Sequence, residues 1–282
     1  MIKIESKINY SYATIKVTQS RIDKGLIAIP VSLVQWFPDH KTTIKVFLDE
    51  SAVLNNKSYS PYTSSTRECR IGGMAEWYKE NKLKDGDEIV VQLIDKKHFI
   101  YRLVPEQKFL LKTQELQSSL DKAESENEAS EKIITLANWA DLEKKKVVHG
   151  EYHRLIKSTP IKERRYMNKY SNRVKEDVPP NIRVLLWELY QGHCQVCDFW
   201  FLKKDNKPYF EIHHINPAQG HHPINLVVVC GNCHNQFEFA NVRNEFTANS
   251  WLTTVSFNNK PYPVNQIFLK TRWEESFKQL YI

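Results

Sequence analysis

Four of the five cysteines in this 282-residue chain form two C-x-x-C pairs, Cys194 with Cys197 and Cys230 with Cys233. Each pair can place two thiolates on one tight turn, and two such pairs can close a tetrahedral zinc site with Zn–S distances of about 2.3 Å. A zinc ribbon with no further chemistry would explain the cysteines alone. The spacing therefore predicts a structural Zn²⁺ site.

Histidine and asparagine residues lie between the two cysteine pairs and directly after them. Residues 211–217 read EIHHINP, which places His213 beside His214, and Asn225 and His234 follow. A purely structural ribbon has no use for these groups, because each imidazole packed in a small unit needs a hydrogen-bond partner. Neighbouring strand residues point to opposite faces, and the Asn-Pro after the histidines indicates a turn. These residues favour a second, open metal site.

This order of motifs resembles the HNH nuclease family, whose ββα-metal module carries C-x-x-C, His-His, Asn and C-x-x-C-His. The matching segments are CQVC, EIHHINP, INLVVVC and GNCHNQF, and the resemblance covers about residues 185–245. It implies that His213 is a metal ligand on the first strand and that His214 is the general base. It also implies that Asn225 orients this base and that His234 is the second ligand, at the start of a helix.

The chemistry requires different roles for the two adjacent histidines. A metal-bound imidazole has lost the free nitrogen that a base needs, whereas an imidazole with a pKa near 6.5 is partly unprotonated at neutral pH. The resemblance implies that a single divalent ion neutralises the scissile phosphate and the leaving oxygen.

One position departs from the family pattern. Many members place a further histidine one helical turn after the last ligand, and this chain has Glu238 there. Residues i and i+4 share a helix face, so Glu238 is either a third ligand, which favours Mg²⁺ or Mn²⁺, or a solvated residue. His221 and His222 are expected to be surface or DNA-facing groups. His193 is expected to pack, and Cys69 to be a buried or half-buried thiol.

The elements around these motifs predict an α+β fold with two domains. Residues 1–105 contain alternating or β-branched runs separated by turns, which indicates a compact barrel or sandwich with a helix over 74–82. Residues 106–178 form a charged helical linker, in which 114–132 favours a solvated helix or flexible spacer over a core. Residues 179–282 form the nuclease domain with its four-cysteine structural zinc, and begin with a helix near Pro179-Pro180.

Two segments of the first domain carry groups that suit DNA contacts. Segments 18–37 and 62–93 resemble the B-three pseudobarrel family, found in plant transcription factors and in the effector domain of some bacterial restriction enzymes. Ile29-Pro30, residues 73–77, residues 81–83 and Gly86-Asp87 match in order, although Trp77 is displaced from its usual place directly after glycine. The family resemblance of this domain implies a β-rich pseudobarrel.

In that family two arms grip the major groove. The resemblance assigns base and phosphate contacts to polar and basic side chains of both arms: Gln19, Ser20, Arg21, Lys24, Tyr62, Thr63, Ser64, Ser65, Thr66, Arg67 and Arg70. The alternative is that these are ordinary polar loops of a small β domain.

The charge and composition favour a polyanionic partner in a reducing compartment. The chain has 40 Lys+Arg and 33 Asp+Glu, a net charge of +7 and a pI near 9.0. The basic run over 144–175 is either an ordinary helical face or a contact with a nucleic-acid backbone. The sequence has no apolar run of membrane-spanning length and no secretory stretch at its start, so a cytoplasmic location without membrane contact is expected.

Together these features predict a sequence-specific type II restriction endonuclease that hydrolyses DNA phosphodiester bonds. One such module cuts one strand, so a homodimer on double-stranded DNA is expected, with a cognate methyltransferase in the same system. The alternatives are a modification-dependent HNH nuclease that reads methylated bases, a nicking homing-type enzyme, and a non-catalytic DNA-binding zinc protein. Residues 246–282 either pack on the nuclease module or form a dimer contact.

Overall fold

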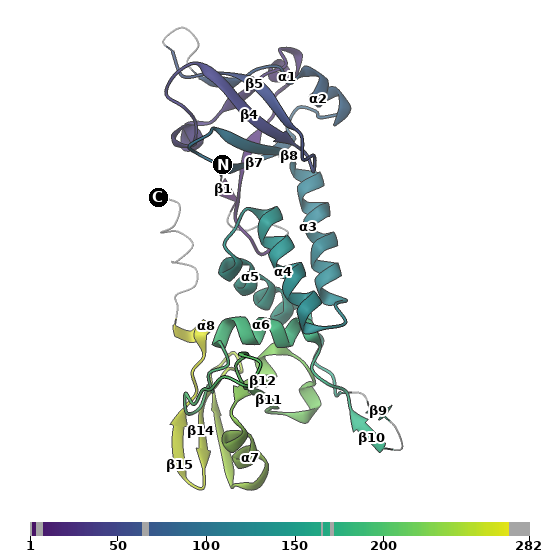
Figure 1. The fold of residues 1–282 in the computed structure, drawn as a ribbon, viewed down its shortest axis with the longest axis vertical. Helices are drawn as coiled ribbons and strands as arrows, with labels where there is room; N and C mark the ends of the chain where they lie inside the picture. The colour runs from purple at the N-terminus through teal and green to yellow at the C-terminus, as the bar shows by residue number, and fades with distance from the viewer. Residues whose placement is uncertain (1, 4–7, 64–67, 165, 170–171, 271–282) are drawn as a thin grey trace. The chain divides into compact units, whose positions relative to one another are not determined.

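The computed structural model describes residues 2–3, 8–63, 68–164, 166–169 and 172–270. The chain divides into two compact units, Met1–Ser118 with Thr135–Glu143 and Ser119–Ile134 with Lys144–Ile282 (Figure 1). Each unit has its own cluster of buried apolar residues. Among the described residues, every helix is too short or too polar to cross a bilayer.

The first unit is built on an eight-stranded sheet with the order β1-β2-β7-β8-β4-β5-β6-β3. Strands β4 and β8 run parallel, the other pairs are antiparallel, and β2 approaches β3, so the sheet is nearly closed. This arrangement confirms the predicted α+β class and barrel-like first domain. The strands are β1 (Ile2–Lys3), β2 (Tyr12–Lys16), β3 (Ile27–Ile29), β4 (Thr42–Leu48), β5 (Leu54–Ser60), β6 (Cys69–Ile71), β7 (Glu88–Asp95) and β8 (Ile100–Pro105).

Between its strands this unit has three short helices: α1 (Gln19–Asp23), η1 (Val31–Trp36) and α2 (Ala75–Glu80). The last confirms the helix predicted over 74–82, and it buries Trp77 and Tyr78 against the sheet. Cys69 is buried in the same core, as expected. Gly86, with φ +91°, forms the predicted turn that leads into β7.

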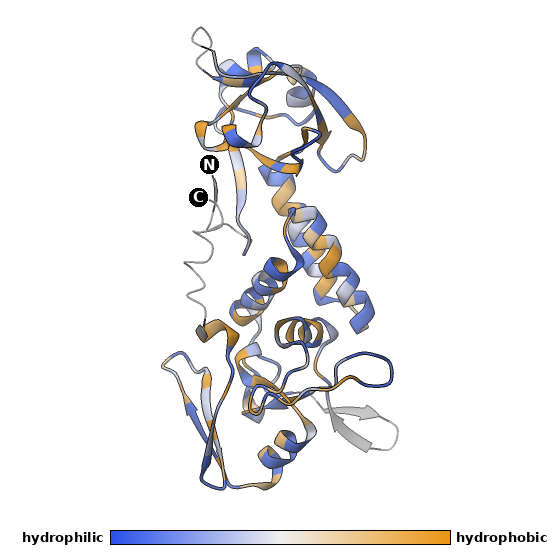
Figure 2. Cartoon of the chain, turned by 60° about the vertical axis from the view of Figure 1, so that its left-hand side comes forward, coloured by the Kyte–Doolittle hydropathy of each residue, from blue (hydrophilic) through white to orange (hydrophobic). Residues whose placement is uncertain are grey.

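Residues 106–178 contain the helices α3 (Glu106–Asp121), α4 (Glu126–Ala140) and α5 (Lys144–Ser158), followed by a hairpin of β9 (Tyr166–Lys169) and β10 (Asn172–Lys175). The predicted helical character is present, but the expectation of a spacer without a core over 114–132 is wrong. Leu120 and Ala129 are fully buried. Apolar residues recur at helical spacing among the charges of α3 and α4, as the mixed colouring of Figure 2 shows.

The second unit contains the motifs that could do chemistry. Its helix α6 (Pro180–Tyr190) starts with proline and buries Ile182, Leu185 and Leu186, as predicted. The antiparallel pair β11 (Glu211–His214) and β12 (Leu226–Val229) leads into α7 (Gly231–Phe239). Two short 3-10 turns lie between these strands, η2 (Pro217–Gln219) and η3 (Pro223–Asn225).

A three-stranded sheet follows α7, with β13 (Val242–Phe246), β14 (Leu252–Phe257) and β15 (Lys260–Pro263), and then α8 (Ile267–Lys270). Leu252, Val255 and Phe257 belong to the same buried cluster as Val227 and Cys230. The described part of the 246–282 segment therefore packs on the ββα unit, which was one of its two predicted roles. Residues 271–282 lie outside the described residues.

Candidate active site

The unit formed by β11, β12 and α7 carries His213, His214 and His234, the histidines predicted to take part in the chemistry. In the β11–β12 pair, His213 lies opposite Val227 and His214 opposite Leu226. All four residues of β12 are buried, which anchors the hairpin in the core. Helix α7 begins directly after Cys230, whose sulfur accepts a hydrogen bond from the Cys233 backbone amide at 3.4 Å. The buried strand β12 thus joins the histidine pair of β11 to the second cysteine pair at the start of α7.

The two C-x-x-C pairs come together as the sequence predicts. The sulfurs of Cys194, Cys197, Cys230 and Cys233 all lie within 4.8 Å of one another. The Cys197 sulfur is 3.7 Å from that of Cys230 and 3.5 Å from that of Cys233. Four thiolates about 2.3 Å from a tetrahedral zinc ion lie about 3.8 Å apart. These four cysteines could therefore bind a zinc ion with little rearrangement.

Ionisation of one of these thiols is favoured before any metal binds. A hydrogen bond from Cys233, together with nearby backbone amides, lowers the pKa of the Cys194 thiol to about 4, although burial opposes this shift. The same contact raises the pKa of Cys233. Since zinc binds thiolates, this electrostatic setting suits a metal site.

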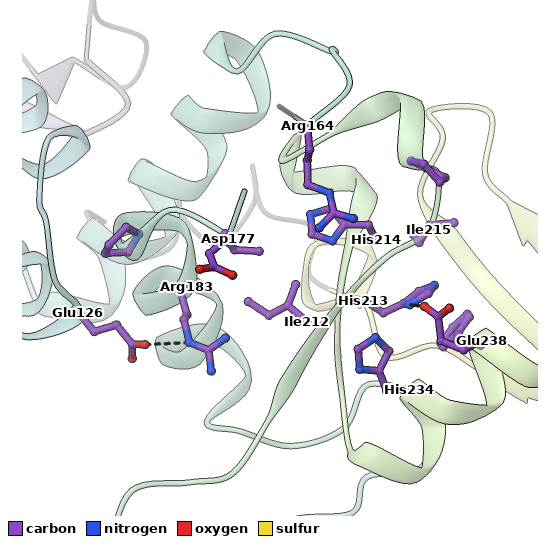
Figure 3. Close-up of a pocket in the computed structure, with 14 residues that line it drawn as sticks. Glu126, Arg164, Asp177, Arg183, Ile212, His213, His214, Ile215, His234 and Glu238 are labelled. Atoms are coloured by element: carbon purple, nitrogen blue, oxygen red, sulfur yellow. Dashed lines mark hydrogen bonds and ion pairs between the residues drawn. The ribbon is translucent and has the colours of Figure 1, made fainter. Parts of the chain in front are cut away.

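A second cluster joins β11 to α7. One possible ligand atom from each of His213, His234 and Glu238 lies within 4.8 Å of the others. The Glu238 carboxylate approaches Nδ1 of His213 at 3.9 Å, and Figure 3 shows the three side chains converging. His234 and Glu238 share one face of α7 because they are four residues apart. Glu238 is 59% exposed, so its carboxylate is free to turn toward an ion.

The environment of His213 keeps its imidazole neutral. Its ring stacks on Phe237, with the centroids 4.2 Å apart and 17° between the planes. Burial is the main cause that lowers the pKa of His213 to about 4, and the nearby His234 and Arg164 contribute to the same shift. Only a neutral imidazole can ligate a metal, so two nitrogens and one carboxylate oxygen form a donor set that fits a divalent ion.

Glu211, which the sequence reasoning missed, contacts one of these histidines. Its carboxylate accepts hydrogen bonds from Nδ1 of His234 and from the hydroxyl of Tyr209. Burial raises the pKa of Glu211, but the hydrogen bonds from Tyr209 and His234 outweigh it and lower the pKa below its ordinary value. The ionised carboxylate leaves Nε2 of His234 as the nitrogen available to a metal. Its position two residues before His213, on the same strand face, is the pattern that could have revealed it.

His214 faces the same pocket but has a different partner. Its Nε2 lies 3.1 Å from Nδ1 of His221, and Nε2 of His221 lies 3.4 Å from a carboxylate oxygen of Glu176. The side chain of His221 is only 10% exposed, so the expectation of a surface group is wrong for this residue. His222 is also buried, and its Nε2 lies 3.0 Å from the Ile156 carbonyl oxygen. Both contacts depend on segments distant in sequence, which local motifs do not reveal.

Asn225 acts on the loop after His214. Its side-chain oxygen accepts a bond from the Asn216 amide at 2.7 Å, and its nitrogen donates to the carbonyls of Asn216 and Gly220 at 2.9 and 2.8 Å. Both N–H groups of the amide are therefore used by backbone oxygens. Asn225 fixes the backbone that continues from His214 instead of donating to the imidazole itself.

His213, His214, His234 and Glu238 line one pocket of about 850 Å³ in the second unit. Arg164 and Arg183 also line it, and Figure 3 shows Arg164 beside His214. Arg183 donates to Glu126 at 2.8 Å, whereas Nε of Arg164 is buried and has no hydrogen-bond partner among the described residues. The pocket thus combines three groups that could bind a metal ion with two further side chains. These are His214, which is not part of the metal-binding cluster, and Arg164, a cation suited to an anionic ligand.

The side chains predicted to contact DNA lie on the first unit. Gln19, Ser20 and Arg21 lie on α1, Lys24 directly follows it, and Arg70 lies on β6. Arg21 and Arg70 both donate to Glu68 at 2.5 Å, which links the two predicted arms. Tyr62 is 62% exposed and Thr63 adjoins it. Ser64, Ser65, Thr66 and Arg67 lie outside the described residues.

His193, which directly precedes the first cysteine pair, lies 2.9 Å from Asp198 through Nδ1 and stacks on Trp200, with 5.7 Å between the ring centroids. It packs on the aromatic loop next to the cysteines, as expected.

The solved structures that are similar to part of this chain include the following two. The Arabidopsis FUS3-DNA complex shares 13% sequence identity over 33% of this chain and 94% of that chain, with a TM-score of 0.29. The N-terminal domain of Helicobacter pylori LlaJI.R1 shares 16% identity over 36% of this chain and 88% of that chain, with a TM-score of 0.27. No protein-family model matches the sequence, and neither does any curated protein.

Proposed function

We propose that this chain is a metal-dependent endonuclease that hydrolyses phosphodiester bonds in double-stranded DNA. One observation carries the proposal: the clustered His213, His234 and Glu238 line the same pocket as His214 and Arg164. A metal-binding group alone would suit a structural site. A neighbouring imidazole and a guanidinium whose Nε is buried add the two groups that phosphodiester hydrolysis needs, a base and a phosphate ligand.

Each side chain then has one task. A divalent ion held by His213, His234 and Glu238, with Mg²⁺ or Mn²⁺ suited to the carboxylate, would supply Lewis-acid stabilisation of charge on the phosphate. His214 takes the proton from the attacking water. Arg164 binds a phosphate oxygen through its planar, permanently charged guanidinium. The four cysteines hold the chain around β12 and α7 with a structural zinc ion.

Substrate selection belongs to the first unit in this proposal. A pocket in a small ββα unit offers little surface with which to read a sequence, whereas specific DNA interfaces need on the order of 1,000 Å². Arg21 and Arg70, joined through Glu68, present guanidinium groups suited to guanine edges or phosphates. The activity proposed is therefore that of a type II restriction endonuclease, acting as a homodimer beside a cognate methyltransferase.

The test is cleavage of one plasmid in unmethylated and methylated forms, with Mg²⁺ or Mn²⁺, by the wild type and by His234→Ala. The proposal predicts discrete fragments from unmethylated DNA and none with the variant. Cutting confined to methylated DNA would instead make the first unit a reader of modified bases. DNA binding without cutting by the wild type, under every metal condition, would contradict the enzyme and favour a DNA-binding zinc protein.

A further inference from the structure

The loop between β11 and β12 places a second histidine behind the proposed base. Nε2 of His214 lies 3.1 Å from Nδ1 of His221, whose Nε2 in turn lies 3.4 Å from Glu176. We propose that His221, backed by Glu176, is a positioning residue that fixes the tautomer and ring orientation of His214. This inference rests on the proposed function, because it assigns His221 a task in the same hydrolysis.

The direction of the hydrogen bond follows from the end of the chain of contacts. Nε2 of His221 has no hydrogen-bond partner among the described residues, but the carboxylate charge of Glu176 at 3.4 Å favours a proton on this nitrogen. A neutral His221 then has an unprotonated Nδ1, which accepts a hydrogen bond. His214 must therefore carry its own proton on Nε2, and its Nδ1 keeps the lone pair that takes a proton from water. In the opposite tautomer of His214, its unprotonated Nε2 would face the unprotonated Nδ1 of His221, and no hydrogen bond could form.

The charges around His221 are compatible with a neutral ring. Burial lowers its pKa, Glu176 and Asp177 oppose this shift, and Arg164 adds to it. The neutral form is the one that can donate from one nitrogen and accept at the other. His221 is thus able to transmit the preference of Glu176 to His214.

The loop that carries His221 is held on both sides. Gly220 has φ +52°, and a Cβ there would collide with the Lys162 carbonyl, so this position requires glycine. The Gly220 carbonyl accepts a bond from Asn225 at 2.8 Å. On the other side, His222 lies 3.0 Å from the Ile156 carbonyl. His221 is therefore fixed between two anchored residues, which a freely solvated histidine would not need.

The kinetic test compares the wild type with His221→Ala and His221→Asn on plasmid DNA. The asparagine oxygen can occupy the place of Nδ1 and accept the same bond, so this variant should keep most of the activity. His221→Ala should lower kcat by about 10- to 100-fold with KM changed less than about 2-fold. Glu176→Gln should have a smaller effect of the same kind. Equal kcat values for the wild type and His221→Ala, or equal losses in the Ala and Asn variants, would overturn the inference.

A spectroscopic test does not depend on cleavage. ¹⁵N shifts of the histidine rings in the full-length, zinc-loaded protein report which nitrogen of His214 carries the proton, with His214→Ala used to assign its resonance. The wild type and His221→Asn should show the Nε2–H tautomer, and His221→Ala a mixture. An Nδ1–H tautomer in the wild type would overturn the inference even if the protein cuts DNA. Conversely, a wild type that has the Nε2–H tautomer but does not cut contradicts the proposed function alone.

Discussion

Glu211 holds His234 through Nδ1, from the strand that also carries His213. One carboxylate thereby fixes the ring of a proposed metal ligand and directs its other nitrogen away from Glu211. Carboxylate–histidine pairs of this kind orient the imidazole and increase its basicity as a ligand.

Replacing Glu211 should weaken divalent metal binding without removing any ligand. Glu211→Gln is expected to lower the affinity for Mn²⁺ by about 10- to 100-fold, because the amide lacks the charge that holds the His234 tautomer. Titration of the zinc-loaded protein with Mn²⁺, followed by electron paramagnetic resonance, measures this. Glu245→Gln, at an exposed position on β13, is the matched control and should bind Mn²⁺ like the wild type. Equal affinities for the Glu211 variant and the control would refute this role.

The four cysteines should hold the second unit together through zinc. Cys194→Ser is expected to release the ion and to lower the free energy of unfolding of this unit by more than about 4 kcal/mol, as the loss of a structural metal does. Metal analysis and urea unfolding check both effects. Cys69 lies in the buried core of the first unit, so the Cys69→Ser variant, used as a control, should keep the zinc ion of the second unit. A Cys194→Ser protein that retains one zinc ion per chain would argue against the four-cysteine site.

Arg164 should act on the substrate, and Arg183 much less. Arg164→Ala is expected to lower kcat/KM by about 100-fold, because it removes a preorganised cation from the phosphate. Arg183→Ala should have a smaller effect, since Glu126 already pairs with that guanidinium. Plasmid nicking rates at several DNA concentrations separate KM from kcat. A larger loss with the Arg183 variant would show that the roles had been assigned in the wrong order.

Stability should fall on the acid side through His149, which lies far from both metal clusters in sequence and is 7% exposed. Burial lowers its pKa to about 4, with a contribution from Lys145. In the unfolded chain the imidazole of His149 has a pKa near 6.5. Below this pH it therefore binds a proton in the unfolded chain before it does so in the folded chain. The contribution of neutral His149 to the free energy of unfolding is therefore complete above pH 6.5 and is lost as the pH falls toward 4.

At pH 5.5 the loss should be about 1.4 kcal/mol relative to pH 7.5, and His149→Phe should not show it. Urea unfolding of both proteins at the two pH values gives the comparison. Other histidines also titrate in this range, but the difference between the two proteins isolates His149. If both proteins lose the same amount of stability, the acid sensitivity has another source.

Local spacing was enough to predict the parts of the site that come from short motifs. His234 and Glu238 share a face of one helix, and each cysteine pair lies on one turn, so sequence order alone brings these groups together. His221 and Arg164 could not be assigned in this way, because the packing of residues 162–164 against Gly220 brings the loop and Arg164 to His214. Glu211 was missed although it shares a strand face with His213, because its partner His234 lies 23 residues away.

The helices α3 and α4 were misjudged for a related reason. Their many charges suggested a solvated spacer over 114–132, but Gln117 and Leu120, at helical spacing, and Ala129 are buried. A narrow buried stripe on a helix can occur in a segment whose average hydropathy is low. The strands of the first unit were easier to predict, because each strand carried its own β-branched pattern and its own turn.

The most direct test of the account is the rate of DNA cleavage by His214→Ala, measured beside its Mn²⁺ affinity in the same preparation. His214 lies outside the proposed ligand set, so the account predicts wild-type Mn²⁺ binding together with a loss of at least about 100-fold in cleavage rate. Cleavage at the wild-type rate with Mn²⁺ still bound would contradict the assignment of His214 as the base.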